Sequence, residues 1–177
     1  MISESDLQQL SAGIRDVQDF PKPGIIFKDI TPVLADPKLF QIAIDAFVAA
    51  TQATGAEKVV GIDARGFLFG AAVAYELGIG FVPVRKKGKL PWKTQRAAYT
   101  LEYGEAVVEM HEDALRPGER VVLIDDLLAT GGTAAAAIKL VEKMGANLLE
   151  AQFLIELDFL SGRKNLPEGK VRAFLHF

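Results

Sequence analysis

The chain of 177 residues contains no cysteine and only two histidines, His111 and His176. The absence of cysteine excludes disulfides, thiolate nucleophiles and cysteine-based zinc sites, and two histidines are too few for a histidine-rich metal centre. No apolar run approaches the roughly 20 residues that a membrane-spanning helix requires. Residues 1–11 lack both a basic and an apolar stretch, so we expect no signal peptide, no membrane partner and a cytoplasmic location.

An excess of charge of one sign is also missing, because the net charge is only −3. This balance argues against a general nucleic-acid-binding protein. Half of the residues are hydrophobic and 24% are charged, which is typical of a globular chain. The length fits a single domain.

Short apolar runs alternate with helical segments along most of the chain. The spacing of apolar residues predicts a helix over residues 4–16, and Asp36-Pro37 is a suitable start for another helix that ends before Gly55. The predicted strands are residues 58–62, 81–84, 120–124 and 148–157. The alternation predicts an α/β fold with a central, mostly parallel sheet flanked by helices, and such sheets bind ligands beyond the carboxyl ends of their strands.

Residues 99–112 follow a different pattern, in which polar and apolar side chains alternate around Gly104-Glu105. Glycine at the first position of a two-residue turn suits a type II′ hairpin. We therefore predict a projecting β-hairpin with its turn at Gly104-Glu105.

The segment at residues 121–133 carries the strongest functional signal. An apolar strand ends at two adjacent carboxylates, Asp125 and Asp126, whose repulsion would be relieved by a hydrogen-bond donor such as a ribose hydroxyl. Residues 130–133, Thr-Gly-Gly-Thr, then enter a helix, so that free amides and hydroxyls face any anion placed there. The alternative is that Asp126 or Thr130 only caps the helix. The segment is neither a P-loop nor a dinucleotide fingerprint, since both glycine patterns are absent.

An apolar strand, two acids and Ala-Thr-Gly-Gly-Thr resemble the phosphoribosyl-diphosphate motif of type I phosphoribosyltransferases. In that family the acids bind the ribose hydroxyls, which implies this role for Asp125 and Asp126. The loop of the family that holds the 5′-phosphate corresponds here to Ala129, Thr130, Gly131, Gly132 and Thr133.

Four further segments resemble the adenine phosphoribosyltransferase family over nearly the full length: residues 20–32, 61–67, 85–96 and 101–104. The first resembles the family's hood over adenine, which implies adenine-binding roles for Ile26, Phe27 and Lys28. Without the motif, Phe27 would be read as a core residue. The second lies under the diphosphate in the family and implies that Arg65 is near the ligand, whereas the residues alone also allow a surface arginine.

The third segment contains six basic residues and no acidic one. It is either a solvated loop or a mobile lid over about residues 86–98 that supplies charge to the leaving diphosphate, and the resemblance favours the lid, with Arg85, Lys86 and Lys89 as ligands. The fourth places a glutamate near the imidazole edge of the base and a tyrosine over the reacting centre. This implies catalytic roles for Glu102 and Tyr103 beside Arg65, although an outward-facing hairpin glutamate is the plainer alternative.

The resemblance implies the conversion of adenine and phosphoribosyl diphosphate into AMP and diphosphate, with Mg²⁺ held mainly by substrate oxygens and water rather than by fixed protein ligands. It also implies a homodimer. Within the domain, residues 1–34 would form the amino-terminal helix and adenine hood, and residues 35–177 the α/β core.

Two rival functions stay open. The first is transfer to hypoxanthine, guanine or xanthine, against which only residues 20–32 and 101–104 argue. The second is a non-catalytic regulator that senses phosphoribosyl diphosphate, for which the sequence offers no nucleic-acid-binding module.

Overall fold

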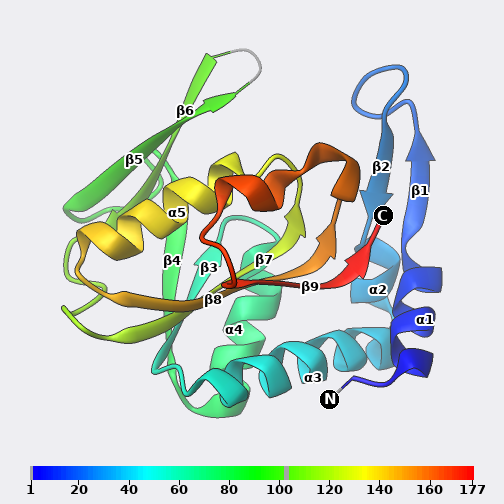
Figure 1. Ribbon diagram of the computed structural model, residues 1–177, viewed down its shortest axis with the longest axis horizontal. Helices are drawn as coiled ribbons and strands as arrows, with labels where there is room; N and C mark the ends of the chain where they lie inside the picture. The colour runs from blue at the N-terminus through cyan, green and yellow to red at the C-terminus, as the bar shows by residue number, and fades with distance from the viewer. Residues whose placement is uncertain (1, 102–103) are drawn as a thin grey trace.

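The computed structural model describes residues 2–101 and 104–177. Within these residues, seven strands form one sheet in the order β5-β6-β4-β3-β7-β8-β9 (Figure 1). They are β3 (Lys58–Ile62), β4 (Gly80–Lys86), β5 (Thr94–Leu101), β6 (Gly104–His111), β7 (Arg120–Leu128), β8 (Asn147–Glu156) and β9 (Val171–His176). Strands β4, β3, β7, β8 and β9 are parallel neighbours, and β5 and β6 form an antiparallel hairpin at one edge. The predicted mostly parallel sheet is confirmed.

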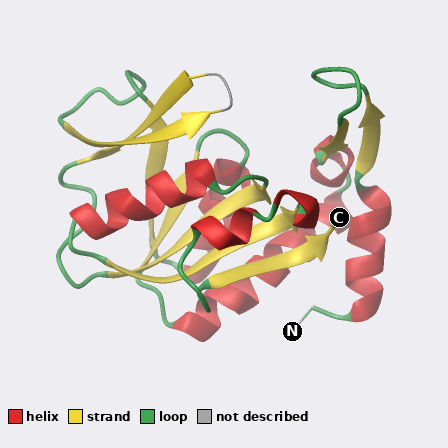
Figure 2. Ribbon diagram, turned by 45° about the horizontal axis from the view of Figure 1, so that its top comes forward, coloured by secondary structure: helices red, strands yellow, loops and turns green. Residues whose placement is uncertain are grey.

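Helices cover both faces of this sheet (Figure 2). Helices α3 (Pro37–Thr54) and α4 (Gly66–Leu77) lie on one face, and α5 (Gly132–Lys143) lies on the other. Helix α3 begins and ends as predicted, because Asp36 accepts hydrogen bonds from two amides of its first turn and Gly55 takes a left-handed conformation at its end. Burial on both faces explains why residues 59–62 of β3 and 121–124 of β7 are apolar.

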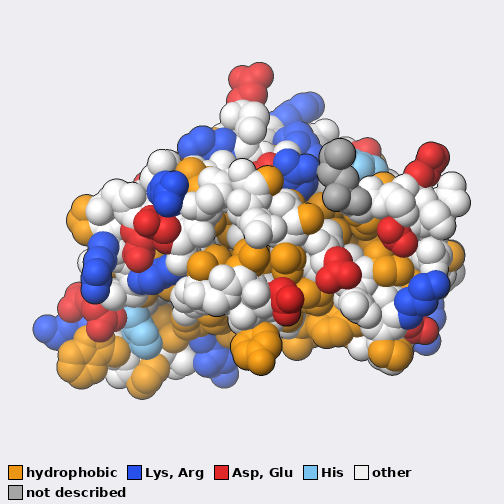
Figure 3. Space-filling model, turned by 90° about the horizontal axis from the view of Figure 1, so that it is seen from below, with side chains coloured by type: hydrophobic (Ala, Val, Ile, Leu, Met, Phe, Trp, Pro, Cys, Tyr) orange, Lys and Arg blue, Asp and Glu red, His pale blue; other side chains and the backbone are white. Residues whose placement is uncertain are grey.

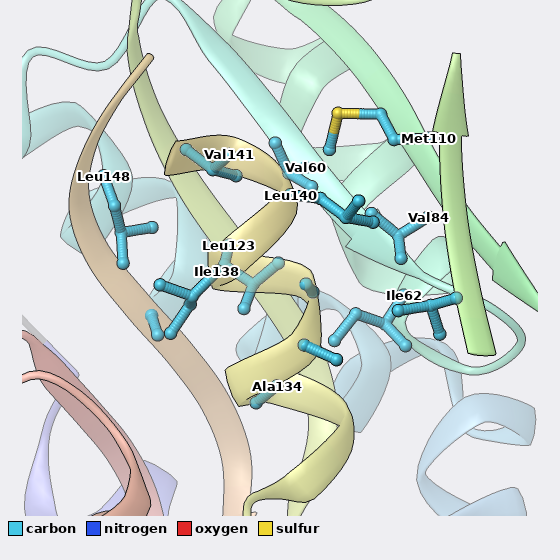
Figure 4. Close-up of a cluster of buried hydrophobic side chains, with 14 of the residues drawn as sticks. Val60, Ile62, Val84, Met110, Leu123, Ala134, Ile138, Leu140, Val141 and Leu148 are labelled. Carbon is cyan, nitrogen blue, oxygen red and sulfur yellow. The ribbon is translucent and has the colours of Figure 1, made fainter. Parts of the chain in front are cut away.

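The core between α5 and the sheet positions the strand ends at which the site lies (Figure 4). Ile138 and Val141 of α5 are buried in the same cluster as Val60, Ile62 and Leu123 of the central strands. This packing fixes the direction of α5, and therefore the direction in which its amino-terminal amides point.

The amino-terminal part adds α1 (Glu4–Gly13), α2 (Thr31–Ala35) and a separate two-stranded antiparallel sheet of β1 (Arg15–Gln18) and β2 (Ile26–Asp29). Helix α1 ends earlier than the predicted residue 16, because Ile14 is extended and leads directly into β1. Two short 3-10 helices, η1 (Asp158–Leu160) and η2 (Gly162–Asn165), join β8 to β9. None of the described helices is long and apolar enough to cross a membrane.

Several further predicted boundaries were wrong. Strand β7 continues past residue 124 to Leu128, because β8 is long enough to pair with it there, whereas its pairing with β3 stops at Ile124. In the hairpin, Leu101 pairs with Gly104, so Gly104 and Glu105 belong to β6 and not to the turn. Strand β5 also begins at Thr94, which places residues 94–98 in the hairpin and shortens the connecting loop to residues 87–93.

Candidate active site

The two adjacent acids lie where β7 extends beyond its neighbour β3. From Asp125 onward β7 pairs only with β8, so its other edge is open to the space above β3. The Asp126 amide donates a hydrogen bond to Asp125 Oδ1 at 2.9 Å, and the Asp126 side chain is almost fully buried. The fold therefore delivers two carboxylates to the same strand end, where both line one pocket.

Burial disfavours the charge on both acids. It raises the pKa of Asp125 well above its ordinary value of 3.8, and the neighbouring charge of Asp126 raises that pKa further. Burial also raises the pKa of Asp126, although the positive charge of Arg65 offsets part of this effect. The pair is thus in need of hydrogen-bond donors.

Arg65 connects these acids to the amino-terminal hood. It ends the turn after β3, at the position that precedes α4, and its Nε lies 2.9 Å from Asp126 Oδ2. The pair lacks hydrogen-bond geometry, because Asp126 Oδ2 has no such partner in the described residues. On its other side the guanidinium carbon lies 5.5 Å from the centre of the Phe27 ring. Residues far apart in the sequence thus converge on one place.

The loop of residues 129–133 leads from β7 into α5. Its Gly131 has φ of 81°, which favours glycine, and no side chain caps the helix. The first hydrogen bond of α5 runs from the Ala135 amide to the Gly131 carbonyl at 2.8 Å, so the preceding amides have no intrahelical partner. A hollow of about 80 Å³ lies against this loop and Asp125. The arrangement can accept a small anion.

A larger pocket of about 320 Å³ adjoins this hollow and shares Asp125, Ala129 and Thr133 with it. Six of the site residues expected from the sequence line the larger pocket: Arg65, Lys86, Asp125, Asp126, Ala129 and Thr133. Three larger hollows, of about 590, 510 and 340 Å³, lie elsewhere on the described surface and contain none of the expected residues. We therefore take the smaller pocket, which has the paired acids, as the site.

Some expected residues lie outside this pocket. Lys28 Nζ is 2.6 Å from Asp16 Oδ1 and 4.1 Å from the centre of the Phe177 ring, so its charge is directed toward the carboxyl terminus. Ile26 is exposed on β2, close to the Phe27 that faces Arg65.

Of the basic residues, Arg85 donates to Asp63 Oδ2 at 2.9 Å and to the Lys89 carbonyl at 3.2 Å, and the Lys89 side chain is exposed. The expected catalytic residues Glu102 and Tyr103 lie outside the described residues.

Three residues at the site were not predicted from the sequence. Asp63 and Tyr99 line the pocket. Gly66 packs so closely that a Cβ there would lie 2.7 Å from Asp125 Oδ1 and 2.8 Å from the Ile124 carbonyl oxygen. Side chains alternate along β5, so Tyr99 lies on the same face as the buried Ala97, and this alternation could have identified Tyr99. The close contact of Gly66 could not be identified in this way, because it depends on how α4 packs against β7.

Known relatives and solved structures are similar to this chain over nearly its full length. An adenine phosphoribosyltransferase of Anaeromyxobacter dehalogenans is 56% identical over 171 residues, covering 97% of this chain and 99% of the relative. The structure of the Rhodothermus marinus adenine phosphoribosyltransferase is 51% identical, has a TM-score of 0.93 and covers 99% and 100% of the two chains. That of the Saccharomyces cerevisiae enzyme, in complex with an imino-altritol bisphosphate and adenine, is 45% identical, has a TM-score of 0.93 and covers 98% and 100%.

The phosphoribosyl transferase domain family matches residues 32–173, which include the sheet, the paired acids and the loop at the start of α5. Fold and site together define a type I phosphoribosyltransferase. Adenine phosphoribosyltransferases with more than half of their residues identical align with this chain over nearly its full length, so a more specific family can be assigned. The chain belongs to the adenine phosphoribosyltransferase family.

Proposed function

We propose that this chain transfers the phosphoribosyl group of 5-phospho-α-D-ribose 1-diphosphate to adenine, giving AMP and diphosphate, as a step of purine salvage. The observation that supports the proposal is that a pocket lined by carboxylates adjoins a hollow lined by the loop at the start of α5. Paired carboxylates line the 320 Å³ pocket, and the adjoining 80 Å³ hollow is lined by the loop at the start of α5, whose first amides have no intrahelical partner. A ribose 5-phosphate needs both surfaces, side by side.

The ribose hydroxyls are assigned to Asp125 and Asp126, because donors from the ligand stabilise two carboxylates that burial otherwise disfavours. The 5′-phosphate is assigned to residues 129–133. The helix dipole alone contributes only about 0.3–1 kcal/mol, whereas each hydrogen bond to a charged group contributes roughly 1.5–3 kcal/mol. Several amides and the two threonine hydroxyls are therefore the main source of phosphate affinity.

The transfer step breaks the bond between C1 of the ribose and the diphosphate oxygen, and the leaving diphosphate keeps the electron pair. As that bond loosens, the ribose gains oxocarbenium character, and N9 of adenine attacks from the opposite face, which inverts the configuration at C1. Attack by N9 leaves a positive charge on adenine until a proton of its imidazole ring passes to a base or to water. We assign Glu102 to accept a hydrogen bond there and Tyr103 to a position over the reacting centre. Arg65, Arg85, Lys86 and Lys89 are assigned to the charge of the diphosphate.

Adenine itself is assigned to the hood at residues 1–34, with Phe27 against the purine face and the Ile26 backbone at its Watson–Crick edge. The short distance between Phe27 and Arg65 supports this, because it puts the hood beside the pocket. The contacts of Lys28 with Asp16 and Phe177 favour a role in holding the hood to the core rather than direct contact with the base.

Mg²⁺ fits this pocket, because the carboxylates of Asp63, Asp125 and Asp126 supply the hard oxygen atoms that it prefers. Bound with the substrate and held mainly by substrate oxygens and water, it would neutralise the negative charge that develops on the diphosphate.

We propose that the chain forms a homodimer, because its resemblance to the family implies one. One feature consistent with it is an apolar stripe on α4, where Leu68 is 47% and Tyr75 is 88% exposed. Figure 3, which views the molecule from below, shows apolar side chains in several patches between charged ones. The cytoplasmic location stays a prediction from the sequence.

The proposed reaction is tested by incubating the purified chain with adenine, phosphoribosyl diphosphate and Mg²⁺, and by separating the nucleotide products. We expect AMP and diphosphate in equal amounts. Binding of phosphoribosyl diphosphate without any AMP would instead favour the non-catalytic sensor.

A further inference from the structure

The segment after β8 passes directly beside the loop of residues 129–133. Asn165, the last residue of η2, donates from its side-chain Nδ2 to the Thr130 carbonyl oxygen at 2.8 Å. Because a carbonyl oxygen can only accept, this contact fixes which end of the Asn165 amide faces the loop. No motif that identified the family includes this contact.

Gly162 brings the two backbones into direct contact. A Cβ on Gly162 would lie 2.0 Å from the Ala129 carbonyl oxygen and 2.9 Å from the Gly131 nitrogen. Conversely, a Cβ on Gly131 would lie 2.4 Å from the Gly162 carbonyl oxygen. Distances this short are incompatible with any side chain, so glycine is required at Gly162 by packing against the loop and not by its own backbone conformation.

The segment of residues 161–165, here called the brace, is itself firmly attached. Arg163 donates from Nε to Glu156 Oε1 at 3.1 Å, forms a second contact with the other oxygen of that carboxylate, and donates to the Val171 carbonyl at 2.7 Å. The Glu156 side chain is only 5% exposed. A two-pronged ion pair of this kind is geometrically restrictive, and it ties the brace to the end of β8 and the start of β9.

We propose that the brace is a positioning element for the phosphate loop, with Asn165 and Gly162 holding the Thr130 carbonyl and the Gly131 backbone in place. A loop that presents several amides to one anion must otherwise be ordered when the ligand binds, and that ordering lowers affinity. The brace carries out this ordering in advance. The inference rests on the proposed function for the identity of the anion, and it assigns no chemical step to the brace.

The test is Asn165→Ala, with ribose 5-phosphate and diphosphate as probe ligands measured by calorimetry. Loss of one ordering hydrogen bond should weaken ribose 5-phosphate binding about tenfold. Diphosphate does not use the 5′-phosphate loop, so its affinity should stay within about twofold of wild type. In steady-state assays the KM for phosphoribosyl diphosphate should rise by a similar factor, with kcat and the KM for adenine little changed. Gly162→Ala should weaken ribose 5-phosphate binding, and raise the KM for phosphoribosyl diphosphate, by larger factors than Asn165→Ala does.

Lys164→Gln is the matched control, because Lys164 is the exposed neighbour of Asn165 and its side chain forms no hydrogen bond or ion pair within the described residues. Ribose 5-phosphate binding by Asn165→Ala equal to that of wild type and Lys164→Gln would overturn the proposal. A parallel loss of both ligands together with a lower melting temperature would also overturn it, in favour of a general structural role. Neither result would touch the proposed function, which fails only if the wild-type chain forms no AMP.

Discussion

At the scale of single residues, Asp125 and Asp126 are adjacent carboxylates whose charge is disfavoured by burial. Their side chains follow four fully buried apolar residues on β7, so the strand has no other polar group to satisfy them. Arg65 forms an ion pair with Asp126 that lacks hydrogen-bond geometry, and its charge offsets only part of the cost of burying the two acids. The pair should therefore reduce stability in the free protein and contribute to affinity in the complex.

Asp125→Asn is expected to stabilise the free protein at neutral pH. The folded-state pKa of Asp125 is raised, so the contribution of this group to stability is fully present below the unfolded value near 3.8 and is lost as pH rises through the folded pKa. The variant should accordingly melt a few degrees higher than wild type at pH 7, and this difference should shrink toward pH 4. Thermal melts across this pH range provide the measurement.

The same variant, and Asp126→Asn, should bind phosphoribosyl diphosphate roughly ten- to a hundredfold more weakly, because each loses a charged acceptor for a ribose hydroxyl. Calorimetry measures this affinity directly. Wild-type affinity in both variants would contradict the assignment of the ribose hydroxyls to the two acids.

Gly66→Ala tests the close packing behind the acids. Its Cβ would lie 2.7 Å from Asp125 Oδ1, so we expect both a stability loss of about 1–3 kcal/mol and weaker phosphoribosyl diphosphate binding. Gly70→Ala is the matched control on the same helix, where the Cβ meets Phe81 at 3.0 Å, away from the site. It should lower stability alone. Equal affinities in the two variants would show that the acids tolerate movement of α4.

At the scale of secondary-structure elements, the loop of residues 87–93 is the part expected to respond to substrate. It joins β4 to β5 and carries lysines next to the pocket that Lys86 lines. Phosphoribosyl diphosphate with Mg²⁺ should protect it from trypsin, whereas adenine alone should not. Cleavage rates that are identical with and without substrate would exclude a closing lid.

Sequence periodicity predicted elements well where local signals and packing agree. Helix α3 has both a capping aspartate and a terminal glycine, and its bounds were predicted correctly. The end of β7 was not, because it depends on pairing with β8 beyond helix α5. The register of the β5–β6 hairpin was not, because it depends on cross-strand pairing that the residues of the turn do not specify. Gly104 looked like a turn residue, yet cross-strand pairing places it within β6.

At the scale of the whole molecule, the site is assembled from segments that the sequence separates widely. The hood contributes Phe27, and the turn after β3 contributes Arg65, which contacts both Phe27 and Asp126. The loop of residues 129–133 lies at the start of α5 and packs against Gly162. The motif residues could be found from the sequence because their types are chemically distinctive. Asn165 and Gly162 could not be found in this way, because only the folded structure shows that they contact the loop of residues 129–133.

The assembly is a separate prediction at this scale. The chain has a mass of 19.2 kDa, and sedimentation should give twice that value for the purified protein. Tyr75→Glu, which places a charge in the exposed stripe of α4, should shift the mass toward the monomer. A wild-type chain that sediments at 19.2 kDa at high concentration would contradict the proposed homodimer.

The most direct test of the proposed function compares adenine with hypoxanthine as acceptors under identical concentrations of phosphoribosyl diphosphate and Mg²⁺. The two bases differ at position 6, where an amine donor is replaced by a carbonyl acceptor, so a site that hydrogen-bonds one leaves buried groups unpaired with the other. Such mismatches can give up to about 10⁴-fold discrimination, and we expect kcat/KM for adenine to exceed that for hypoxanthine by a factor approaching this. Comparable rates of AMP and IMP formation would contradict the adenine specificity proposed for this chain.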